Sequence, residues 1–134
     1  MIIGTLLAIP LSDGRWTACQ IVGATEKDFT VADLNWIGEE PPSVAQLRKA
    51  AVLRVDHHNW SGAVQWRRVA GPPPPEFRVI GEMPPLMKGE CSAYGGWLGL
   101  GLQIHLQARW DALPAKIRRA RGASSRRRGS TCRS

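Results

Sequence analysis

Every second residue from Leu98 to Trp110 is apolar without exception, and most residues between them, within 97–111, are polar or glycine. A period of two is typical of a β-strand that has one buried face and one solvated face. We therefore predict a strand here, and at about 3.3 Å per residue it would be roughly 50 Å long, so we expect a bend near Gly99 and Gly101. The predicted core side consists of Leu98, Leu100, Leu102, Ile104, Leu106, Ala108 and Trp110. The predicted solvated side consists of Trp97, Gly99, Gly101, Gln103, His105, Gln107, Arg109 and Asp111.

Three short strands are predicted within the first 36 residues. The apolar run 2–10 is followed by Ser12, Asp13 and Gly14, which is a strong hairpin signal because Asp and Gly tolerate positive φ. A second strand is expected over residues 15–22. After a polar connection, a third strand is expected over residues 28–36. This meander indicates a small, curled antiparallel sheet.

One short helix is predicted over residues 44–53. Ser43, followed three residues later by Gln46, has the spacing of a capping box. The apolar residues that recur at helical period are Val44, Leu47 and Ala51. Further strands are expected over residues 52–56, 63–70 and 77–80. The predicted fold class is α+β and mostly β, with a strongly bent antiparallel sheet or a partly open barrel.

The formal net charge of +7 comes from the C-terminus. Residues 112–134 contain eight Lys and Arg residues and no acid, which leaves ten basic and eleven acidic residues in 1–111. We predict one β-rich domain over 1–111 and a basic tail over 112–134. The tail has too few apolar residues to offset its ordering entropy and is expected to be disordered. It could contact nucleic acid without sequence preference, be merely solvated, or derive from a shifted reading frame.

Neither a membrane segment nor a secretory signal is predicted. The longest apolar stretch, residues 1–11, is interrupted by glycine and proline and is shorter than the roughly 20 residues of a membrane helix. It has no basic residues before it and no small-residue cleavage site. Cys19, Cys91 and Cys132 are odd in number and far apart, so they indicate a reducing cytoplasm rather than a disulfide framework.

Catalytic and cofactor motifs are missing from the sequence. The candidate metal ligands are Asp56, His57, His58, Cys91 and His105, but the usual zinc spacings are absent, and adjacent histidines on a strand point to opposite faces. No nucleophile motif or phosphate-binding loop is found. We therefore expect a chain without enzymatic activity, metal or cofactor.

An acidic segment surrounds Trp36 and is the first candidate for a partner-binding surface. Acids beside an aromatic ring can steer a basic protein and anchor it with a desolvated side chain. The alternative is that Trp36 belongs to the core and the acids are only solvated. The candidate residues are Glu26, Asp28, Asp33, Trp36, Glu39 and Glu40. A second candidate is the polar face of the last strand, formed by Gln103, His105, Gln107 and Arg109.

Residues 3–16, which read IGTLLAIPLSDGRW, resemble the opening of the immunity protein 26 family. The segment 77–84, FRVIGEMP, resembles a later strand of that family. The resemblance covers roughly residues 3–22 and 77–111. Members are bacterial proteins encoded beside polymorphic secreted toxins and are thought to bind and neutralise them.

The resemblance implies a cytoplasmic, non-enzymatic inhibitor whose partner is the cognate toxin domain. It transfers no catalytic or binding residue to this sequence, so the candidate sites rest on charge and aromatic content alone. The alternative is a small nucleic-acid-associated β-barrel that binds through the basic tail and exposed tryptophans.

Overall fold

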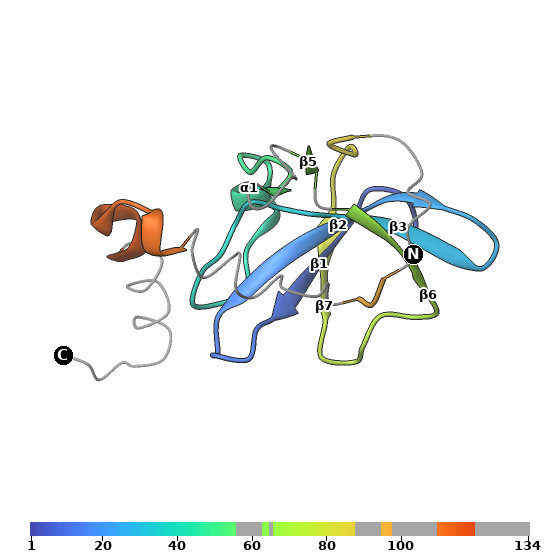
Figure 1. Ribbon diagram of the computed structural model, residues 1–134, viewed down its shortest axis with the longest axis horizontal. Helices are drawn as coiled ribbons and strands as arrows, with labels where there is room; N and C mark the ends of the chain where they lie inside the picture. The colour runs from blue at the N-terminus through green and yellow to red at the C-terminus, as the bar shows by residue number, and fades with distance from the viewer. Residues whose placement is uncertain (56–62, 65, 88–94, 98–109, 120–134) are drawn as a thin grey trace.

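The computed structural model describes residues 1–55, 63–64, 66–87, 95–97 and 110–119 (Figure 1). Within these residues the chain forms an open five-stranded antiparallel sheet with strand order β6-β3-β2-β1-β7, and a separate two-stranded pair, β4-β5. The sheet consists of β1 (Thr5–Pro10), β2 (Trp16–Ala24), β3 (Asp28–Asp33), β6 (Trp66–Ala70) and β7 (Arg78–Glu82). The other elements are α1 (Val44–Leu47), β4 (Arg54–Val55) and β5 (Ala63–Val64). The prediction of a mostly β fold with an antiparallel sheet is confirmed.

The hairpin between β1 and β2 forms where the turn residues predicted it. The Leu11 amide donates to the Arg15 carbonyl at 2.8 Å, and Asp13 Oδ1 accepts from the Arg15 amide at 3.0 Å. Gly14 has a φ of 89°, a conformation that a side chain would disfavour. The local sequence therefore determines this turn.

Both faces of the three central strands of the sheet, β1, β2 and β3, are buried. One face carries the cluster Leu7, Ile9, Cys19, Ile21, Val31, Val69, Phe77 and Trp97. The other face carries Leu6, Ala18, Leu34, Trp36, Leu47 and Met83. Because successive side chains of a strand point to opposite faces, almost every residue of β1, β2 and β3 is enclosed. Polar side chains in these strands are enclosed with them and need partners.

Gln20 shows how such a buried polar group is satisfied. Its Nε2 donates to the Met83 carbonyl at 3.0 Å and to the Gly4 carbonyl at 3.3 Å. Its Oε1 accepts from the Leu86 amide at 2.9 Å. This one side chain therefore joins β2 to the start of β1 and to the segment after β7.

The predicted helix is shorter in the structure, ending at Leu47 rather than at residue 53. The chain beyond it is used for pairing with the end of β3: the Asn35 amide donates to the Ala51 carbonyl and the Leu53 amide to the Asp33 carbonyl, both at 2.8 Å. Since these long-range bonds require an extended backbone, they prevent further helical turns. The strand predicted over 52–56 is correspondingly reduced to β4.

The predicted third strand also ends early, at Asp33 instead of residue 36. The Trp36 amide donates to the Leu34 carbonyl at 2.9 Å, which is the bond of a γ-turn centred on Asn35. This turn takes Trp36 out of the sheet while keeping its ring against the helix-covered face.

The alternating stretch 97–111 is only described at its ends. Trp97 was predicted on the solvated side, but it is buried between the rings of Phe29 and Phe77, with centroid distances of 6.2 and 6.0 Å. Trp110 is buried, as predicted, in a third cluster with Leu11 and Leu53. It lies in a short helical segment, residues 110–112, rather than in a strand. Residues 98–109, and with them Gln103, His105, Gln107 and Arg109, lie outside the described residues.

Candidate functional site: a pocket beside Trp36

The acids of the predicted acidic surface do not gather on one surface. Glu26 is exposed in the turn between β2 and β3, whereas Glu39 is exposed and Glu40 partly exposed in the segment between β3 and α1. These two segments lie at opposite ends of the sheet (Figure 1). The exposed acids that are close in sequence therefore form two separate groups in space, Glu26 in one and Glu39 with Glu40 in the other.

Asp33 lies in the core. Its side chain is 1% exposed and forms an ion pair with the Arg67 guanidinium of β6. Arg67 also donates from Nε to the Gly96 carbonyl at 2.6 Å and from a terminal nitrogen to the Trp97 carbonyl. Burial raises the pKa of Asp33, and the positive charge of Arg67 opposes this shift. Asp33 is therefore a structural residue in this fold, enclosed where a partner does not reach it.

Asp28 is also engaged within the sheet. Its carboxylate contacts Arg68 Nε at 2.9 Å, and the Asp28 side chain is largely buried. Asp28 and Asp33 stand at the two ends of β3, and each pairs with one of the two consecutive arginines of β6. These two acids therefore fasten β3 to the edge strand.

Trp36 is 6% exposed and belongs to the core cluster under α1. Its carbonyl accepts from Thr17 Oγ1 at 2.7 Å, which fixes the backbone beside β2. Gly38 lies against the ring: a Cβ there would be 2.5 Å from Trp36 Cη2. Gly38 is itself held by two backbone hydrogen bonds to Trp16, of 2.8 and 3.0 Å. The indole is therefore clamped from this side.

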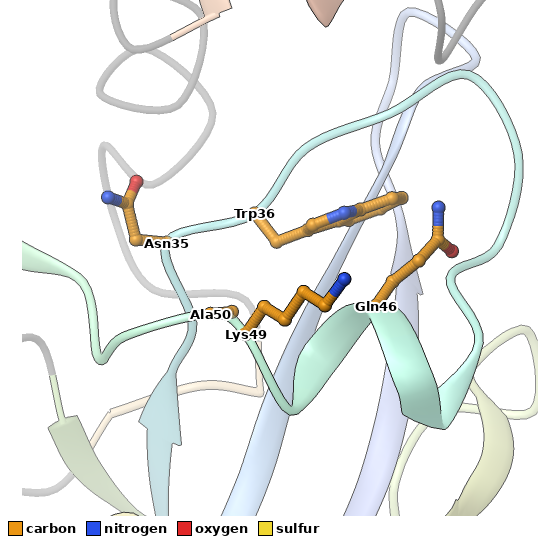
Figure 2. A pocket seen from close by; sticks show the side chains of 5 residues that line it. All are labelled: Asn35, Trp36, Gln46, Lys49 and Ala50. Carbon is orange, nitrogen blue, oxygen red and sulfur yellow. The ribbon is translucent and has the colours of Figure 1, made fainter.

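A pocket of about 240 Å³ opens beside the indole and is lined by Asn35, Trp36, Gln46, Lys49 and Ala50. The γ-turn supplies Asn35 and Trp36, and α1 with the turn after it supplies the other three residues. In Figure 2 the Lys49 side chain runs below the indole toward Gln46, and Asn35 stands at the other end. Residues from two elements thus meet around one aromatic ring.

The orientation of the Gln46 amide follows from the capping box. Gln46 Oε1 accepts from the Ser43 amide at 2.9 Å, while Ser43 Oγ accepts from the Gln46 amide at 3.2 Å. Because Oε1 is committed to the backbone, Nε2 is the atom that faces away from the helix terminus, on the side of the indole (Figure 2). The pocket therefore offers an aromatic surface, one ammonium group and amide donors.

Of the pocket residues, only Trp36 was predicted as a site residue. Gln46 was recognised for its capping role, and Lys49 stands three residues further along, where side chains of a helix share a face. That spacing could have indicated a polar face next to the apolar stripe. Asn35 could not be placed from the sequence because its position depends on the γ-turn.

The remaining candidate groups give no second site among the described residues. Cys19 is fully buried, and burial raises its thiol pKa, so it is not a reactive thiolate. Within the described ranges no three His, Cys, Asp or Glu side chains come together as metal ligands. Asp56, His57, His58, Cys91 and His105 lie outside those ranges.

Two further predictions concern membranes and the basic tail. No helix in the described part of the chain is long and apolar enough to cross a membrane. Of the basic tail, residues 112–119 are described and include a helical segment over 115–119. Residues 120–134, and the prediction of disorder for them, lie outside the described residues.

Comparison of the chain with protein-family models finds no match, and neither the curated proteins nor the solved structures give a significant match.

Proposed function

We propose that this chain is a non-enzymatic immunity protein that binds a cognate bacterial toxin and neutralises it by occlusion. The proposal draws on the resemblance of residues 3–16 and 77–84 to the immunity protein 26 family. These segments fall on the β1–β2 hairpin and on β7, and β1 pairs with β7. The parts of the chain that carry the resemblance are therefore neighbours in one sheet, although about sixty residues separate them in sequence.

The observation that carries the proposal is the rigid pocket wall formed by Trp36. Binding hot spots are enriched in Trp and cluster where a partner side chain fills a preformed pocket. The clamp by Gly38 and the hydrogen bond from Thr17 to the Trp36 carbonyl hold this tryptophan in place. A preorganised wall loses little side-chain entropy when a partner binds.

The pocket would be an anchor within a larger interface. Stable complexes bury on the order of 1,600 Å² in total, far more than one pocket supplies. Glu39 and Glu40 lie in the same segment as Trp36, so they would belong to the surrounding surface and could steer a basic partner region.

The first test is whether a large secreted protein with a toxin-like C-terminal domain is encoded beside this gene, and the second is coexpression of this chain with that domain. Cell growth in the presence of that domain and a stoichiometric complex on gel filtration are the expected results. Absence of both protection and complex would exclude the proposed function. A variant without residues 120–134 should protect equally well, because the proposed surface lies in the folded domain.

A further inference from the structure

We infer that the pocket beside Trp36 binds a single carboxylate of the protein partner, either an acidic side chain or a C-terminal carboxylate. The inference rests on the proposed function in taking the ligand from a protein partner. The chemistry of the pocket itself can be tested without that partner.

The polar groups around the pocket favour an acceptor with negative charge. None of its five lining residues is acidic, and Lys49 supplies a full positive charge. Gln46 turns its Nε2 toward the indole side because its Oε1 is held by the Ser43 amide. A carboxylate oxygen between Lys49 Nζ and Gln46 Nε2 would accept a charge-assisted hydrogen bond and a neutral one.

The pocket is smaller than a usual cofactor site and suits one side chain. Sites for small molecules and cofactors usually measure about 300–1,000 Å³, and this pocket measures about 240 Å³. The methylene stem of a Glu side chain, packed against the indole, fits this volume.

The charge count distinguishes a carboxylate from a phosphate. A phosphate group carries a charge of about −1.5 to −2 near neutral pH and is usually held by several cations or by a set of backbone amides. Among the described residues, Lys49 is the one cationic side chain that lines this pocket. A singly charged carboxylate is therefore the matching ligand.

Small probes test this on the whole chain by NMR. N-acetylglutamate N-methylamide carries a side-chain carboxylate, N-acetylglycine a terminal one, and N-acetylglutamine N-methylamide is the uncharged control. We expect at least one acid to shift the Trp36 indole and Gln46 side-chain signals, and the stronger binder identifies the source of the carboxylate. Equal shifts with the uncharged amide, or no shift with either acid, would overturn the inference.

A matched pair of variants links the effect to the charge in the pocket. Lys49→Gln should weaken acid binding about two- to fivefold, as expected for an exposed ion pair, and Lys49→Arg should restore it. Arg48 is the adjacent, exposed cation and does not line the pocket, so Arg48→Gln should leave binding unchanged. Equal losses in Lys49→Gln and Arg48→Gln would indicate general attraction and contradict a pocket.

The two proposals fail separately. If the pocket binds the acid probes but the toxin domain forms no complex, the carboxylate site is supported and the proposed function is contradicted. If the toxin domain binds with full affinity to Lys49→Gln and leaves the Gln46 side-chain signals unchanged, the proposed function is supported and the carboxylate site is contradicted.

Discussion

Gly38 does not line the pocket, but it fixes the position of the Trp36 ring, which forms one wall of it. Its backbone has no unusual φ, so the need for glycine comes from contact with the Trp36 ring alone. The two hydrogen bonds to Trp16 keep the backbone from moving away. Only a displacement of the indole could relieve a larger side chain at this position.

Gly38→Ala should therefore disturb Trp36 and destabilise the fold by about 1–3 kcal/mol, the usual effect of overpacking. Urea unfolding gives the free energy, and the chemical shift of the Trp36 indole proton reports the displacement. Gly14→Ala is the control, since Gly14 has positive φ and open space around it. It should lower stability through the turn while leaving the Trp36 signal in place; an unmoved signal in Gly38→Ala would contradict the clamp.

Arg67 and Arg68 are consecutive residues of β6 with opposite environments. Arg67 and Asp33 are enclosed, with side chains 6% and 1% exposed, whereas Arg68 is partly exposed in its pair with Asp28. Removing one member of a buried pair leaves an uncompensated charge in the core. The Asp28 carboxylate is also largely buried, but Arg68 is partly exposed, so water and salt screen this second pair in part.

Arg67→Met should cost about 3–5 kcal/mol of unfolding free energy, and Arg68→Met less, about 1–2 kcal/mol, both measured by denaturant unfolding. Replacing both partners, as in Asp33→Leu with Arg67→Met, should cost less than Arg67→Met alone, because no buried charge remains. Equal effects of Arg67→Met and Arg68→Met would contradict the burial difference.

The same variant should show a characteristic pH dependence. Burial raises the pKa of Asp33 in the folded chain above its ordinary 3.8, and loss of Arg67 removes the charge that opposes this rise. The folded state then binds a proton that the unfolded state has released, so stability is greatest below about pH 4 and falls as pH rises. We expect the stability deficit of Arg67→Met relative to the unmutated chain to grow between about pH 4 and pH 7. A deficit that shrinks with rising pH would contradict the sign.

At the scale of elements, α1 depends on its cap more than on its length. The helix spans only Val44–Leu47, yet both bonds of the capping box are formed. Those bonds also orient Gln46 toward the pocket. Stability and site geometry are therefore linked at Ser43.

Ser43→Ala should lower the free energy of unfolding by about 1 kcal/mol and broaden or shift the Gln46 side-chain signals. Ser43→Asp keeps an acceptor at the N-cap and should stay within a few tenths of a kcal/mol of the unmutated chain. Thermal unfolding of the two variants provides the comparison. Equal losses would show that the hydroxyl does not act as a cap.

The elements that the sequence predicted well are those set by neighbouring residues. The β1–β2 turn needs only Asp13 and Gly14, and the capping box needs only Ser43 and Gln46. The predicted ends of β3 and α1 were wrong, because the observed ends are set by hydrogen bonds between residues 33–35 and 51–53. Such pairing between segments far apart in sequence leaves no mark in local periodicity.

For the whole molecule, burial of the central strands on both faces means that an acidic residue in these strands can be enclosed and not part of a surface. From the sequence, we predicted that Asp28 and Asp33 form one acidic surface with Glu26, Glu39 and Glu40. With both faces covered, the two aspartates serve β3 and β6, and the exposed glutamates separate to opposite ends. What remains as a candidate surface is the end of the sheet that carries Trp36, where a lysine rather than an acid lines the pocket.

The most direct measurement is the dissociation constant of the complex with the cognate toxin domain proposed above, compared for Lys49→Glu and Arg48→Glu. Both variants change the net charge by the same amount on adjacent exposed residues, and only Lys49 lines the pocket. In the complex the partner would cover the pocket, and truncating one member of such a buried interfacial charge pair costs about 2–5 kcal/mol; about 1.4 kcal/mol is a tenfold change in affinity. We predict that Lys49→Glu weakens the complex by at least about tenfold, while Arg48→Glu changes it by less than about threefold. Equal affinities in the two variants would contradict the assignment of the Trp36 pocket as the partner-binding site.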